Sequence, residues 1–293
     1  MSPVERNLCV LNGNGSAEIL IGGDSRAKYN LIPSVIEKET GKKCVNIAEP
    51  LTLGGDLPAL IKILKKYPNV MASHPILVLS VNLESLNDLG YTGTPVATLL
   101  AWSPWDHLRV TLQQPRRYTT YFFGDFIPGL KTLWQNKKNG KMFVCQDSLF
   151  SSSRLMDLKG YEPLEGRKSD QDLYHWPTDE HRYLLDGVRR RDFEKSLQWL
   201  SQSQAKRVIL YQAPFDTAWV HKVSGAKSLT IPDQFSEILK QEATLFPKIL
   251  FLDFYRTDVP NLIPRQHFYD LVHLNHQGAE IFSQYMGKRL ATP

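Results

Sequence analysis

Five short apolar runs, each about the length of a β-strand, constrain the fold of this chain more than any other feature. They occupy residues 18–22, 43–47, 76–81, 207–211 and 249–254. Successive residues in each run are apolar instead of alternating with polar ones, which is typical of parallel strands covered on both faces. Segments with apolar residues at helical spacing lie between the runs, at 56–66, 192–201 and 232–245, and a further one at 277–290 follows the last run. This alternation predicts an α/β fold with a five-stranded, doubly wound parallel sheet.

The interval at about 83–190 is far longer than an ordinary crossover between two parallel strands. We therefore expect one domain over residues 1–293, with a long and mainly helical insertion after the third strand. The insertion contains Trp102, Trp105 and Arg109 among many aromatic and arginine residues, and its part at 147–177 has the composition of an irregular loop. Such a mixture suits a sugar-stacking platform or a nucleic-acid surface, but more often forms a core. We expect no nucleic-acid partner.

Composition and charge exclude several classes of protein. The chain is 42% hydrophobic and 22% charged, which is ordinary for a globular protein, and its apolar runs are too short to cross a bilayer. Three widely spaced cysteines predict neither a disulfide framework nor a zinc site. The first 14 residues lack the pattern of a secretory leader. We expect a cytoplasmic protein as the chain stands, or a periplasmic or extracellular one if a leader was trimmed.

A serine and an Asp-His pair, far apart in the sequence, carry the chemistry. Ser25 follows the first apolar run, whereas Asp270 and His273 lie three residues apart near the C-terminus. A serine hydroxyl becomes a good nucleophile when an imidazole takes its proton and a carboxylate fixes the tautomer of that imidazole. We therefore predict that Ser25 is the nucleophile, His273 the base and Asp270 its orienting acid. His273 and His276 are two imidazoles three residues apart, and two imidazoles alone make a poor metal site, so we expect no metal site and no cofactor.

These motifs make the chain resemble the SGNH hydrolases, the superfamily also called GDSL esterases and lipases. Residues 23–26, Gly-Asp-Ser-Arg, are similar to the block that holds the nucleophile of that family, and residues 270–273, Asp-Leu-Val-His, to the block that holds its acid and base. The run 268–278 is especially similar to the branch that acts on bacterial surface polysaccharides and their acyl groups. The resemblance implies a three-layer, flavodoxin-like fold and a serine esterase that needs no cofactor.

The resemblance also implies an oxyanion hole. Its donors would be the backbone of Ser25, a glycine that is either Gly54 or Gly55, and the side chain of Asn82 after the third strand. The third block reads Ser-Val-Asn-Leu here, where the family has Gly-x-Asn-Asp, and Arg26 replaces the usual leucine of the first block. Arg26 can bind an anionic group of the substrate or pair with an acidic neighbour such as Asp24.

The expected activity is the cleavage of acyl esters, with acetyl or another short acyl group on a carbohydrate as the favoured substrate. Two alternatives stay open at this point. The same acyl-enzyme can pass its acyl group to a sugar hydroxyl, which would make the protein an O-acyltransferase. The scaffold can also serve as a non-catalytic carbohydrate-binding protein that uses the aromatic insertion, Trp102 and Trp105 in particular, instead of Ser25.

Overall fold

In the part of the chain that the structure describes, five parallel strands form one sheet. The structure is a computed structural model, and it describes residues 16–48, 57–66, 68–87, 158–167, 184–216, 230–255 and 262–292. The strands are β1 (Ile19–Gly22), β2 (Cys44–Asn46), β3 (Ile76–Ser80), β4 (Arg207–Gln212) and β5 (Ile249–Asp253). Each strand coincides with a predicted apolar run to within one residue at either end.

The sheet has the order β2-β1-β3-β4-β5, which is the order of flavodoxin-like sheets. Leu20 of β1 lies opposite Val45 of β2 on one side and opposite Leu77 of β3 on the other. The chain therefore reverses its direction of winding at β1. In open parallel sheets, ligands bind outside the carboxyl ends of the strands at such a reversal. The residues that follow β1 and β3 lie at that place.

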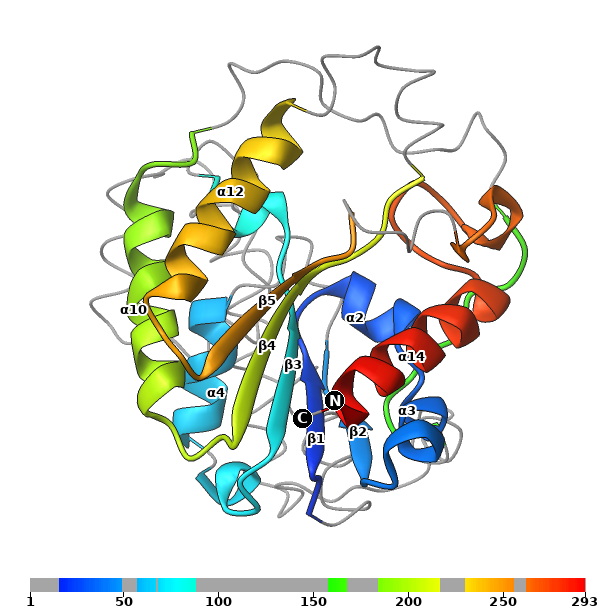
Figure 1. Cartoon of the computed structure of the whole chain (residues 1–293), viewed down its shortest axis with the longest axis horizontal. Coiled ribbons are helices and arrows are strands. Elements are labelled where there is room, and N and C mark those ends of the chain that lie inside the picture. Colours follow the sequence, from blue (N-terminus) through cyan, green and yellow to red (C-terminus); the bar gives the residue numbers. More distant parts are fainter. Residues whose placement is uncertain are drawn as a thin grey trace, which may run out of the picture.

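Helices cover both faces of the sheet and complete three layers (Figure 1). One face carries α4 (Leu57–Lys66), α10 (Val188–Gln202) and α12 (Thr230–Thr244). The other face carries α2 (Ser25–Asn30), α3 (Pro33–Thr40) and α14 (His276–Ala291). Short 3₁₀ helices are η1 (Pro68–Met71), η2 (Leu83–Ser85) and η6 (Arg265–His267). The predicted α/β fold is confirmed. No helix among the described residues is long and apolar enough to cross a bilayer.

Alternate residues of the strands supply two separate hydrophobic cores. On β1, Leu20 points into the core shared with α4, α10 and α12, whereas Ile19 and Ile21 point into the core shared with α2, α3 and α14. Phe193 of α10 and Phe282 of α14 are each fully buried in these two cores. Burial of such a side chain stabilises the fold by roughly 1.5–3 kcal/mol, so packing on both faces holds the strand ends in place.

The helices α2 and α3, between β1 and β2, are absent from the sequence prediction. The six residues of α2 make fewer than two turns, too few to establish a helical period. α3 has only eight residues; it begins at Pro33, where a proline suits the first turn, and it ends before Gly41, whose φ is +68°. The segment after Ser25 is therefore helical, and the serine is the first residue of a helix.

Most of the predicted insertion, including Trp102, Trp105 and Arg109, lies outside the described residues. The helix predicted at 192–201 is present as α10, which begins four residues earlier, at Val188, and continues to Gln202. The apolar stripe of this helix starts only at Phe193, and the polar first turn before it carries no helical pattern.

Residues 158–167, which belong to the insertion, form a turn and irregular backbone beside β2 and α14. The N–H of Asn46 in β2 donates a hydrogen bond to the carbonyl of Lys159 (2.9 Å), and the N–H of His276 in α14 donates to the carbonyl of Leu164 (2.9 Å). This part of the predicted irregular loop contains neither helix nor strand. It ties the second strand to the last helix.

The tie to β2 depends on Gly160. Its φ is +90°, and a Cβ atom at this position would lie 1.8 Å from the carbonyl oxygen of Asn46. Only glycine fits, because any side chain would have both an unfavourable backbone conformation and no space. Gly41, at the end of α3, has a similar φ of +68° but nothing within 4 Å of the same point.

We expect Gly160→Ala to destabilise the fold more than Gly41→Ala. Both variants carry the left-handed backbone cost of roughly 1–2 kcal/mol, and only the first adds an overlap worth about 1–3 kcal/mol. Urea denaturation followed by far-UV circular dichroism measures both losses under the same conditions. Equal losses for the two variants would contradict the close approach of residue 160 to β2.

Candidate functional site

Ser25 lies at the carboxyl end of β1, as the first residue of α2. Asp24 caps this helix, since its Oδ1 accepts a hydrogen bond from the N–H of Arg26 (3.0 Å). The turn between strand and helix needs Gly23, whose φ is +116° and whose Cβ, if present, would lie 2.4 Å from Ser80 Oγ. The turn brings the half-buried Ser25 to the sheet edge where β3 also ends.

Asp270 and His273 lie in the loop that precedes α14. An isolated antiparallel bridge between Phe268 and Leu274 closes this loop, and the N–H of Tyr269 donates to the carbonyl of His273 (2.8 Å). His273 Nδ1 lies 3.0 Å and 2.9 Å from the two carboxyl oxygens of Asp270. The predicted side-by-side placement of the acid and the base is present, and it occurs within a loop.

The structure brings the three predicted catalytic residues together. His273 Nε2 lies 2.8 Å from Ser25 Oγ, although the two residues are 248 positions apart in the sequence. A carboxylate only accepts hydrogen bonds, so the proton on Nδ1 faces Asp270 and the lone pair of Nε2 faces the serine hydroxyl. In this tautomer the imidazole can take the serine proton, which is the arrangement that nucleophilic catalysis requires.

Hydrogen bonds keep Asp270 ionised. Burial by itself raises the pKa of Asp270, but the hydrogen bond and positive charge of His273 lower it, as do the N–H groups of Val272 and His273. These N–H groups donate to Asp270 Oδ1 at 3.0 Å and 2.9 Å. The net pKa of Asp270 lies below the usual value for an aspartate. The carboxylate is thus available to stabilise a protonated His273.

Asn30, which the sequence prediction missed, fixes the position of the loop relative to Ser25. Its Nδ2 donates to the carbonyl of Val272 (3.2 Å), and its Oδ1 accepts from the N–H of Leu274 (2.9 Å). These bonds hold the backbone on both sides of His273. Asn30 is fully buried at the last position of α2. Its partners lie 242 and 244 positions away, so no local pattern in the sequence could signal this role.

Tyr29 also contacts the site. Its ring packs edge-on against the ring of His273, with the centroids 5.5 Å apart and an angle of 84° between the planes. Such edge-to-face pairs are favourable because the positive edge of one ring meets the negative face of the other. The helix α2 therefore holds the imidazole through Tyr29 and its loop through Asn30.

Asn82 follows β3 and is almost completely buried, at 3% exposure. Its Nδ2 donates to Asp24 Oδ2 in a short hydrogen bond, while its Oδ1 has no hydrogen-bond partner among the described residues. Asn82 thus lies at the same strand-end edge as Ser25, as predicted. Gly54 and Gly55, the alternative glycines of the predicted oxyanion hole, lie outside the described residues.

Arg26 lies next to Ser25 in the sequence, and its guanidinium group contacts two other side chains of the protein. Its guanidinium carbon is 5.1 Å from the centroid of the Phe215 ring, and its Nε is 3.9 Å from Asp24 Oδ2. Its Nη1 is buried and has no hydrogen-bond partner among the residues that the structure describes. The pairing with Asp24 that the sequence offered as one alternative is present, as a long contact.

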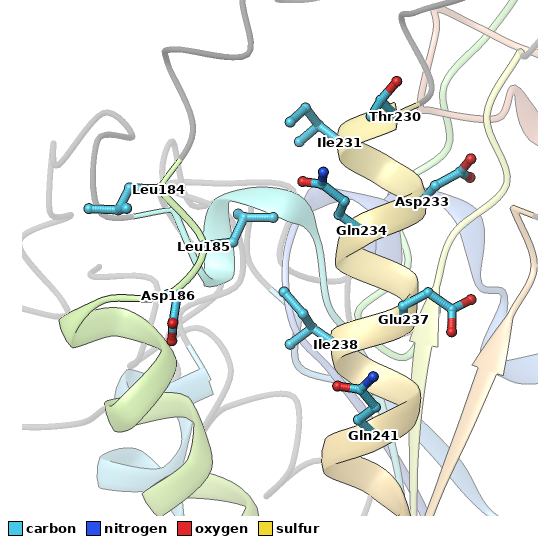
Figure 2. Close-up of a pocket in the computed structure, with 10 residues that line it drawn as sticks. All are labelled: Leu184, Leu185, Asp186, Thr230, Ile231, Asp233, Gln234, Glu237, Ile238 and Gln241. Atoms are coloured by element: carbon cyan, nitrogen blue, oxygen red, sulfur yellow. The ribbon is translucent and has the colours of Figure 1, made fainter.

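A concave region lies between α12 and the segment before α10 (Figure 2). This pocket has a volume of about 640 Å³ and is lined by both apolar and polar side chains. Ile231, Gln234 and Ile238 point from α12 toward Leu185. None of the triad residues lines it. In the described ranges, no group of three or more His, Cys, Asp and Glu side chains is placed to hold a metal ion.

Comparison with known proteins gave no assignment for the chain. No protein-family model matches its sequence, and no curated protein matches it either. The candidate site therefore rests on the geometry of Ser25, His273 and Asp270.

We expect Asp270→Asn to destabilise the fold at pH 7 and to have a smaller effect in acid. Because the folded-state pKa of Asp270 lies below its unfolded-state pKa, the carboxylate stabilises the fold above the unfolded-state value. That contribution is lost as the pH falls through the folded-state pKa, so the difference between wild type and variant should shrink below about pH 4. Urea denaturation at several pH values measures this difference.

Asp186→Asn is the matched control, because the side chain of Asp186 is 87% exposed. We expect this substitution to change the free energy of unfolding by no more than about 1 kcal/mol at any pH, as for other exposed ion pairs. A loss for Asp270→Asn that is the same at every pH would contradict the lowered pKa of Asp270.

Proposed function

We propose that the protein is a serine hydrolase that cleaves acyl esters through a Ser-His-Asp acyl-enzyme mechanism. The observation that carries the proposal is the 2.8 Å contact between Ser25 Oγ and His273 Nε2, with Asp270 on the other ring nitrogen at 2.9 Å. Ser25 is only half buried and His273 keeps 19% of its side chain exposed, so a substrate carbonyl can reach the hydroxyl.

The proposed reaction begins when Ser25 Oγ attacks the ester carbonyl carbon and its proton moves to His273 Nε2. The carbonyl electrons move onto oxygen, where Asn82, the N–H of Ser25 and the N–H of Gly54 or Gly55 donate hydrogen bonds. The bond to the alcohol then breaks, and His273 returns the proton to the departing oxygen. Water repeats these steps on the acyl-enzyme, with Asp270 ionised throughout.

The proposed substrate is an acetyl or short-chain ester of a carbohydrate. This choice rests on the resemblance of residues 23–26 and 268–278 to SGNH hydrolases, in particular to the branch that modifies bacterial polysaccharides. The parallel sheet of order 2-1-3-4-5 and the placement of Ser25 after its first strand are consistent with that resemblance. The proposed chemistry requires no metal ion or organic cofactor.

We expect Ser25→Ala to abolish ester turnover, with a loss in kcat of roughly 10⁴-fold or more, as for other triad nucleophiles. p-Nitrophenyl acetate serves as substrate, and a fluorophosphonate probe followed by peptide mass spectrometry should place the label on Ser25. Ser201→Ala, a serine on the distant helix α10, is the control and should keep wild-type turnover and labelling. Wild-type protein with neither turnover nor label at Ser25 would refute the proposal.

Transfer to a sugar would use the same acyl-enzyme, so the two activities differ only in the nucleophile that resolves it. For a hydrolase, we expect added saccharide acceptors to leave the rate of acetate release unchanged. Mass spectrometry of the saccharide, alongside an acetate assay, measures the partition. Acyl groups captured by the saccharide faster than by water would instead assign the protein as an O-acyltransferase.

A further inference from the structure

Asp24 is a buried carboxylate, 2% exposed, that makes no contact with His273 in the described structure but has three hydrogen-bond donors around it. Its Oδ1 accepts from Ser80 Oγ (2.6 Å) and from the N–H of Arg26 (3.0 Å). Its Oδ2 accepts from Asn82 Nδ2. The carboxylate thus links the turn after β1 to both polar residues at the end of β3.

Asn82 is the residue whose orientation depends on this link. A side-chain amide can place either its oxygen or its NH₂ group toward a neighbour, and the choice follows from the hydrogen bonds available. A carboxylate cannot donate, so only the NH₂ group of Asn82 can face Asp24. One N–H of that group is then used, and the second remains for another acceptor.

We infer that Asp24 is a positioning residue that fixes the amide of Asn82 with its NH₂ group toward the reacting carbonyl oxygen. This inference rests on the proposed function, because it concerns the oxyanion donor of that reaction. The preorganised donor needs no rearrangement when charge develops on the oxygen, which is the condition under which such donors are most effective.

Asp24 is itself held in one orientation. Ser80 Oγ accepts from the N–H of Asp24 (3.1 Å) and donates to its Oδ1, so this hydroxyl bridges the backbone and the side chain of the same residue. The capping bond from Arg26 N–H meets the same Oδ1. With Oδ1 held by two donors, the plane of the carboxylate is fixed, and its Oδ2 accepts from Asn82 Nδ2.

This arrangement makes Asp24→Asn a sharp test, since the variant keeps the size and shape of the side chain. The new amide oxygen must take the place of Oδ1, because the N–H of Arg26 and the hydroxyl of Ser80 both donate there. The new NH₂ group then faces Asn82 and requires an acceptor. Asn82 must rotate its amide by half a turn, which removes its N–H from the oxyanion.

The experiment is a double-mutant cycle in the full-length chain with Asp24→Asn, Asn82→Ala and the combined variant. We expect Asp24→Asn to lower kcat for p-nitrophenyl acetate toward the roughly 10²–10³-fold that loss of one oxyanion donor costs, with little change in KM. In the Asn82→Ala background, the same substitution should change kcat by less than about threefold, because its effect acts through the missing amide.

Glu242→Gln is the matched control, a buried carboxylate that pairs with Arg190 across α10 and α12. It should reduce thermal stability and leave kcat unchanged, which separates a general loss of stability from loss of the donor. If Asp24→Asn does not fold, Ser80→Ala loosens Asp24 instead, and its smaller loss of kcat should likewise disappear in the Asn82→Ala background.

The outcomes separate the role of Asp24 from the proposed esterase activity. If the wild type is active and the losses of kcat caused by Asp24→Asn and Asn82→Ala multiply in the combined variant, the proposed role of Asp24 is overturned. The esterase proposal is then left intact. Wild-type kcat in Asp24→Asn would do the same. A wild type with no turnover and no label at Ser25 would overturn both.

Discussion

The two hydrogen bonds from the side chain of Asn30 are the interaction on which the candidate site depends. They join the end of α2 to the backbone on both sides of His273, across more than 240 residues of chain. Because α2 also carries Ser25 as its first residue, one helix of six residues sets the distance between the hydroxyl and the imidazole. The bond from Leu274 is buried and the bond to Val272 is partly buried, and a buried carbonyl or N–H without a partner would cost about 1–3 kcal/mol.

The sheet explains why so many polar side chains meet at this place. The strands are apolar on both faces and pack into two cores, so polar residues can follow only where the strands end. The winding reverses at β1, and the ends of β1 and β3 lie side by side. Asp24, Ser80 and Asn82 therefore share one edge, and every described contact among them pairs a donor with an acceptor.

The sequence was sufficient for the sheet, for four of the covering helices and for the three residues of the candidate triad. Continuous apolar runs and long helical stripes depend only on local periodicity, and Ser25 and the Asp270-His273 pair stand at positions where that periodicity breaks. α2 and α3 were missed because each is too short to show a period. The start of α10 was misplaced because its first turn is polar.

The roles of Asn30 and Tyr29 could not be predicted from the sequence for a different reason. Each role is defined by a contact with the loop around His273, and the residues themselves are an ordinary asparagine and tyrosine in a short polar segment. The same holds for the orientation of Asn82. Its position after β3 can be predicted from the local sequence, but its hydrogen bond to Asp24, 58 residues away, cannot. Spacing in the sequence can point to candidate reactive groups, but it does not point to the residues that hold those groups in place.

The acid and the base occupy one short loop, whereas the serine belongs to a different part of the chain. Asp270 accepts the N–H of His273 as well as its ring nitrogen, so these two residues move together if the loop moves. Arg167, from the insertion, donates to the carbonyl of Phe268 at the base of that loop (3.2 Å). Arg167 at the base of the loop and Asn30 beside His273 therefore hold the acid and the base as one unit against the end of the sheet.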